Sequence, residues 1–106
     1  MPKYLVEASY TAEGLKGLHK EKASGRRKAL QEAVEALGGK VETFYFALGE
    51  HDVVTVVELP DIASVAAIAL AASSTGLVRT RTTALMTVEE ADHALGMKTK
   101  YRGPGK

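Results

Sequence analysis

The sequence of 106 residues contains no cysteine. Disulfide bonds and thiolate chemistry are therefore excluded, and a metal site would have to use histidine, aspartate and glutamate. The longest apolar run, residues 65–72, is far shorter than the ~18 residues that a membrane-spanning helix needs. No basic-then-apolar leader opens the chain, and the lack of cysteine suits a reducing compartment. We therefore expect a cytoplasmic protein that has no membrane partner.

Motifs that hold cofactors or nucleophiles are also missing. The chain has no glycine-rich phosphate loop, no nucleophile elbow and no pair of histidines at metal-ligand spacing. The formal net charge is only +1, and the basic stretch over residues 16–28 has no interleaved aromatic residues. The sequence therefore predicts no cofactor, no metal site and no nucleic-acid partner.

The most informative stretch is residues 40–60, in which two β-prone segments flank a sequence typical of a tight turn, Gly49 to Asp52. The second segment, residues 53–57, is apolar on both faces. Such a strand is usually central in a sheet and covered twice. We therefore expect a central hairpin here.

Hydrophobic periodicity and capping residues predict the other elements. Before the hairpin we expect a strand over 3–10, a short helix capped by Thr11 with Leu15 and Leu18 inward, a polar break over 19–24, and a helix from Ser24 to Leu37. After the hairpin we expect a helix over 62–74 capped by Asp61 with Ile62 and Val65 inward, a strand over 77–86, and a short helix over 88–95 capped by Thr87.

This order predicts an α+β fold, a ferredoxin-like βαββαβ sandwich with a four-stranded antiparallel sheet, helices on one face and a short C-terminal helix. Residues 1–96 would form a single domain, and residues 97–106 a flexible basic tail. Leu5, Val54 and Val56 would then lie on the uncovered face of the sheet. An apolar face of that size favours a homodimer or a higher oligomer over a monomer.

The turn also carries a family resemblance. Gly49 to Val54 (GEHDVV), preceded by Phe44-Tyr45 and followed by Glu58 to Asp61 (ELPD), resembles the GYD domain family, which is named for Gly-x-Tyr-Asp at this turn. His51 stands where that family has its tyrosine, so no role of a phenol is carried over to this position. The family is similar to the dimeric α/β-barrel group, in which the open sheet faces of ferredoxin-like protomers form a shared barrel. The resemblance implies such an oligomer and no assigned reaction.

His51 and Asp52 are the first candidates for chemistry, because an imidazole beside a carboxylate is a plausible general base. However, adjacent residues at the start of a strand point in opposite directions. The sequence therefore favours a simpler interpretation, in which Asp52 hydrogen-bonds the backbone of the turn and His51 lies in solvent.

A second set of candidates is predicted on the open face, where alternation places Glu7, Arg79 and Arg81, with Glu58 added by parity with Val54. These charges suit an anionic or carbonyl-bearing ligand. Alternatively, they pair with one another across strands or across subunits and fix the register of the dimer. The pattern favours this second interpretation.

Hydroxyl groups form a third set of candidates. Tyr45, Thr43 and Ser9 would offer hydroxyls to a pocket between the sheet and the helices, unless Tyr45 is simply a core ring.

Three functions remain open. The first is an oligomeric α/β-barrel protein that binds a small organic ligand. The second is a cofactor-independent monooxygenase or isomerase acting on an enolisable aromatic or carbonyl substrate, in which His51 or Glu58 takes the proton and Arg79 or Arg81 holds the oxyanion. The third is a structural assembly protein without a ligand. Fold alone does not decide among them.

Overall fold

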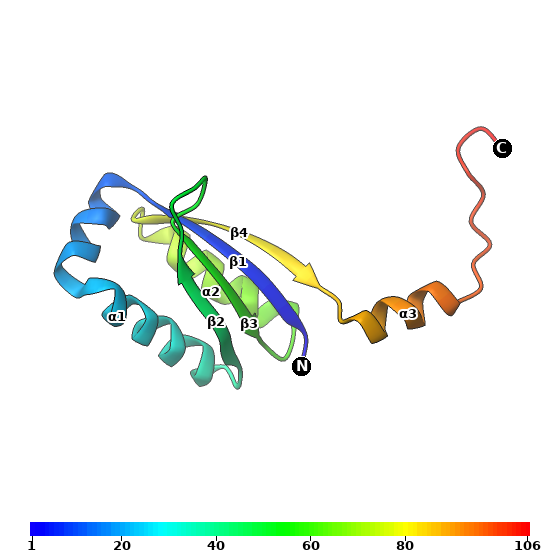
Figure 1. The fold of residues 1–106 in the computed structure, drawn as a ribbon, viewed down its shortest axis with the longest axis horizontal. Coiled ribbons are helices and arrows are strands. Elements are labelled where there is room, and N and C mark those ends of the chain that lie inside the picture. Colours follow the sequence, from blue (N-terminus) through cyan, green and yellow to red (C-terminus); the bar gives the residue numbers. More distant parts are fainter.

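A computed structural model describes residues 1–106. Its elements, in chain order, are β1 (Lys3–Tyr10), α1 (Ala12–Ala36), β2 (Lys40–Phe46), β3 (Val53–Glu58), α2 (Ile62–Ser74), β4 (Val78–Leu85) and α3 (Val88–Gly96). The four strands form one antiparallel sheet in the order β2-β3-β1-β4. Helices α1 and α2 lie on the same face of this sheet (Figure 1). The α+β, ferredoxin-like fold predicted from the sequence is confirmed.

Alternation along β3 separates the two faces of the sheet. Val53, Thr55 and Val57 are buried against the helix layer, whereas the residues between them are only half-buried on the uncovered face. This uncovered side, which we call the open face, carries Leu5, Val54 and Val56 as predicted. β3 is also an inner strand, as its apolar sequence indicates.

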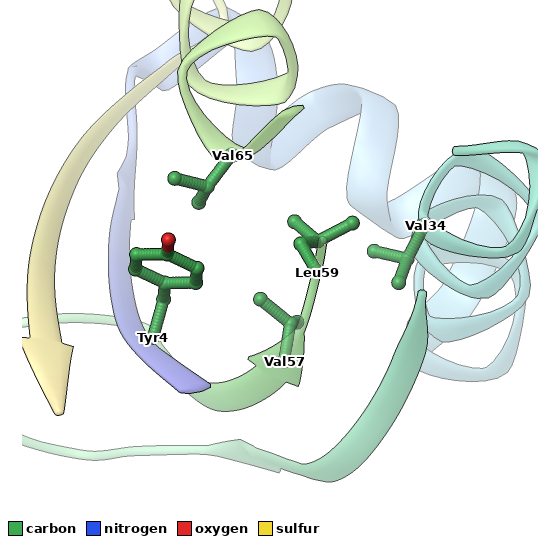
Figure 2. Close-up of a cluster of buried hydrophobic side chains, with 5 residues drawn as sticks. All are labelled: Tyr4, Val34, Val57, Leu59 and Val65. Atoms are coloured by element: carbon green, nitrogen blue, oxygen red, sulfur yellow. The ribbon is translucent and has the colours of Figure 1, made fainter. Parts of the chain in front are cut away.

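The buried core lies at one end of the sandwich. Figure 2 shows its five members, Tyr4, Val34, Val57, Leu59 and Val65, which come from β1, α1, β3, the residue after β3, and α2. Only 8 of the 106 residues are buried. The core is small because α1 and α2 share this cluster but leave open space between them over the rest of the sheet.

Helix α1 differs from the prediction in its break. The expected polar gap over residues 19–24 is reduced to one residue, Lys22, which has a left-handed backbone (φ 71°) and kinks the helix. Ser24 therefore lies inside α1, and the predicted cap at this residue is wrong. The cap at Thr11 is confirmed, because its side chain accepts a hydrogen bond from the Gly14 amide.

Two side chains expected to point inward are exposed instead. Leu15 follows Gly14, the residue with which α1 approaches the sheet, so its side chain points away. Ile62 lies in the first turn of α2, before the helix reaches the core at Val65. The cap of α2 at Asp61 is confirmed by its hydrogen bond from the Ser64 amide.

The connection between β2 and β3 is longer than the predicted tight turn. It spans residues 47–52, so Leu48, expected in the strand, is fully exposed in the loop. The Asp52 amide donates to the Ala8 carbonyl oxygen and its carbonyl accepts from the Ala47 amide. The first bond attaches the loop to β1, and the second joins the two ends of the loop.

A β-bulge in β2 lies between Val41 and Thr43. The Thr55 hydroxyl donates to the Thr43 carbonyl oxygen at 2.6 Å, and the Thr43 hydroxyl accepts from the Val56 amide at 3.3 Å. The extra residue reverses the alternation beyond it. Phe44 consequently faces the helix layer, and Tyr45 faces the open side of the sheet.

Helix α3 begins with a capping box, in which Thr87 and Glu90 each accept from the other's backbone amide. The helix and the residues after it extend away from the end of β4 (Figure 1). The radius of gyration is accordingly 16.8 Å, against about 13 Å for a compact domain of this length. No helix has the length and apolar character needed to cross a membrane.

Candidate functional site

Cross-strand pairing places three of the predicted ligand-binding residues in one row on the open face. Tyr45 of β2 is paired with Val54 of β3, Val54 with Glu7 of β1, and Glu7 with Arg81 of β4. Arg79 belongs to the next row, in which it is paired with Ser9. Side chains in directly paired positions lie about 5 Å apart at Cβ. The alternation predicted for Glu7, Arg79 and Arg81 therefore brings them together.

His51 closes this group from the loop before β3. Its Nδ1 is 3.1 Å from the Ser9 hydroxyl, and its Nε2 is 3.8 Å from Oε2 of Glu7. Only 19% of the His51 side chain is exposed, so the histidine is not in solvent as the simpler interpretation expected. We call these six residues the open-face cluster: Glu7, Ser9, Tyr45, His51, Arg79 and Arg81.

Asp52 has the backbone role predicted for it. Its carboxylate accepts a hydrogen bond from the Tyr10 amide at 2.9 Å. Together with the bond from the Asp52 amide to Ala8, this contact holds the loop against the end of β1 and presents His51 to Ser9. Asp52 and His51 therefore act on different partners, as expected for adjacent residues at the start of a strand.

The two arginines have no ionic partner within the chain. Arg79 and Arg81 are exposed, and neither forms an ion pair within 4 Å, even though Arg81 is paired with Glu7 in the sheet. Two guanidinium groups beside a single carboxylate leave a local excess of positive charge. Such groups provide paired N–H donors for a carboxylate, an enolate or another planar oxyanion.

Glu58 lies at the other end of the open face. It is paired with Lys3 and Lys40, and its Oε2 is 3.8 and 3.7 Å from their ammonium nitrogens. Lys3 also hydrogen-bonds Glu42, and this bond raises the pKa of its ammonium group. Four residues of β1, about 13 Å, separate this row from Glu7. Glu58 and His51 therefore do not meet at one site within the chain.

A family model for the GYD domain matches residues 4–95, which is most of the chain. The protein belongs to the GYD domain family. Comparisons with curated proteins and with solved structures found no match. The family membership is therefore the one result of these comparisons, and the function of this GYD domain has to be argued from its own residues.

Ser9 is the member of the open-face cluster whose contact sequence analysis missed. Alternation places it on the same face as Glu7, which was a usable signal. Its contact with His51 depends on how the loop over residues 47–52 bends towards β1. Tyr45 was a predicted candidate, but the bulge turns it from the expected helix side to the open face, where 67% of it is exposed.

The GYD domain also has a concavity on the opposite side of its sheet, which was predicted only in outline. A cleft of about 890 Å³, which we call the helix-side cleft, lies between α1, α2 and the helix-facing residues of the sheet. Its hydroxyl groups come from Tyr10, Thr55, Thr75, Thr80 and Thr82, and not from Tyr45, Thr43 and Ser9. Burial raises the pKa of the Tyr10 phenol, although the nearby Arg26 cation opposes this effect.

Proposed function

We propose that this GYD domain is a small oligomeric protein that binds a small organic anion at the open-face cluster. The observation that carries the proposal is the pair of unpartnered guanidinium groups, Arg79 and Arg81, beside Glu7 and the half-buried His51. The exposed ring of Tyr45 lies in the same row and offers an aromatic surface. A planar carboxylate or carbonyl compound with an apolar body matches these groups.

We expect ligand binding to need an oligomer, because the open-face cluster is open to solvent in a single protomer and a second sheet would enclose it. Leu5, Val54 and Val56 form a half-buried apolar belt beside it on the same face. Packing two such faces together removes this belt from water and encloses the cluster between two sheets. This is the shared barrel that the resemblance to the dimeric α/β-barrel group implies.

Replacing both arginines with glutamine is expected to weaken the binding of an anionic probe. In an amide NMR titration with benzoate, shifts should concentrate at residues around Glu7, Ser9 and His51, and benzamide should bind more weakly. Each lost charge-assisted contact is worth about 1.5–3 kcal/mol, so the loss of both should weaken binding by at least roughly a hundredfold. The variant Arg102→Gln, in the C-terminal tail, is the matched control.

Native mass spectrometry of protein purified from its own source complements this titration. A bound organic mass on an oligomer would identify the natural ligand. An oligomer of bare mass that ignores benzoate and benzamide alike would favour the structural assembly protein over the ligand-binding one.

Proton abstraction is a second candidate function, favoured by the contacts of His51. With a proton on Nε2 facing Glu7, the Nδ1 atom is free to accept the Ser9 proton, and removal of a substrate proton becomes possible if Ser9 moves aside. Arg79 and Arg81 would then stabilise the enolate oxygen that forms. This is the chemistry of a cofactor-independent isomerase or monooxygenase acting on an enolisable substrate.

Deuterium exchange tests this candidate without knowledge of the natural substrate. In D₂O, the protein should speed exchange of the benzylic hydrogens of phenylpyruvate above the buffer rate. General base catalysis contributes about 10²–10⁴-fold, so His51→Gln should remove most of the increase. The control His93→Gln, on exposed α3, should leave it intact. An increase that survives His51→Gln would exclude His51 as the base.

A further inference from the structure

The helix-side cleft has alanines along both of its helical walls, which leaves space between α1 and α2. Ala29 and Ala33 of α1 face Ala67 and Ala71 of α2 across it. Of its 31 lining residues, 22 are hydrophobic. Its volume of about 890 Å³ falls in the range of small-molecule sites, which is ~300–1,000 Å³. The alanines cannot fill this space, so apolar surface of the sheet and helices stays accessible to a guest.

One end of the helix-side cleft is closed and apolar. Val34 of α1 and Val65 of α2 reach the same buried cluster there, together with Leu59 (Figure 2). The floor then follows β3 from Leu59, in this cluster, towards Val53, with Val6 and Ala8 of β1 beside it. Leu59 and Val53 are six positions apart along an extended chain, a distance of about 20 Å. The cleft is therefore elongated, and an extended apolar chain would fit its length.

The other end of the helix-side cleft carries charge. Lys20, Glu21 and Arg26 line it beside the kink of α1, near the Tyr10 phenol. Nε of Arg26 is 3.5 Å from Oε2 of Glu21, which leaves the terminal amino groups of Arg26 without an ionic partner. Lys20 forms no ion pair. Two cations against one carboxylate give this end a net charge of +1.

We propose that the helix-side cleft binds an amphipathic monocarboxylate of the fatty-acid type. The aliphatic tail lies along β3 between the alanines of α1 and α2, and its methyl end contacts the Val34–Leu59–Val65 end. The carboxylate lies at Lys20 and Arg26, where the guanidinium donates to it. A neutral hydrocarbon would give Lys20 and Arg26 no ionic partner. A short anion would leave the apolar walls exposed.

Isothermal titration calorimetry of the full chain tests this site. The ligands are octanoate, decanoate and dodecanoate, each below its critical micelle concentration. One-to-one binding should strengthen with chain length by up to about fourfold per methylene. The neutral 1-octanol should bind at least roughly tenfold more weakly than octanoate.

Two pairs of variants locate the bound molecule. Arg26→Gln should remove the preference for octanoate over 1-octanol, and its neighbour Arg27→Gln, which is exposed and outside the cleft, should retain it. Ala67→Phe should weaken dodecanoate binding at least tenfold by occupying the cleft. Ala63→Phe, on the same helix but outside the cleft, should not. The pair at Arg26 and Arg27 keeps the test valid if Ala67→Phe folds poorly.

The absence of saturable binding, or binding that Ala67→Phe and Arg26→Gln leave unchanged, would overturn the proposal. Binding that appears only after deletion of residues 87–106 would also overturn it. That result would assign the cleft to the C-terminal arm of a second copy, whose Val88 and Leu95 are exposed in the protomer. Because the open-face cluster lies across the sheet, the double arginine variant at 79 and 81 should bind dodecanoate normally.

Discussion

Replacing Gly14 with alanine is expected to lower the free energy of unfolding by about 3 kcal/mol. A Cβ at this position would lie 2.0 Å from the Leu77 carbonyl oxygen, far inside van der Waals contact. That oxygen cannot easily move, because it accepts hydrogen bonds from the amide and the hydroxyl of Thr11, the cap of α1. The clash therefore separates the start of α1 from the start of β4.

Gly17→Ala is the matched control for Gly14→Ala, since both glycines lie in the same part of α1. Apart from its chain neighbours and the backbone of its own helix, nothing lies within 4 Å of a Cβ built on Gly17. Alanine there should raise stability by about 0.5–1 kcal/mol through its higher helix propensity. Urea unfolding followed by circular dichroism measures both variants. Equal stability of the two would mean that α1 does not approach Leu77 as closely as the structure shows.

Elements specified by local signals were predictable from the sequence. The caps at Thr11, Asp61 and Thr87 each bond an amide three residues ahead, so neighbouring residues determine where these helices begin. The bulge between Val41 and Thr43 was not predictable in this way. It depends on hydrogen bonds to Thr55 and Val56, and a one-residue shift reverses the face of every later side chain in β2.

The same distinction explains the open-face cluster. Alternation alone groups Glu7 with Arg79 and Arg81, because regular strands keep a strict period of two. His51 could be named as a candidate, but its partners could not. Its position depends on the bonds between Asp52 and the end of β1, 42 residues earlier in the chain for Tyr10. The helix-side cleft depends on the paths of α1 and α2, and the kink at Lys22 alters the first of these.

Val56→Asp is expected to dissociate the proposed oligomer. Val56 lies at the centre of the open face, between Leu5 and Thr43 in paired positions. If two open faces pack together, the substitution introduces a carboxylate from each subunit into an apolar contact. An uncompensated buried charge costs about 3–5 kcal/mol, so the dissociation constant should rise by roughly a thousandfold. Light scattering or analytical ultracentrifugation across a concentration series measures the change.

Two further variants distinguish an interface effect from a folding effect. Ile62→Asp places the same charge on an exposed residue of α2, on the other side of the sheet, and should leave the subunit count unchanged. Val56→Thr keeps the shape and β-propensity of valine but adds a hydroxyl, so it should weaken association by a smaller amount than aspartate does. If Val56→Asp retains native circular dichroism and the wild-type subunit count, the open face is not the interface. The cluster of Glu7, His51 and Arg81 would then lie in open solvent, and the enclosure on which its ligand binding rests would be lost.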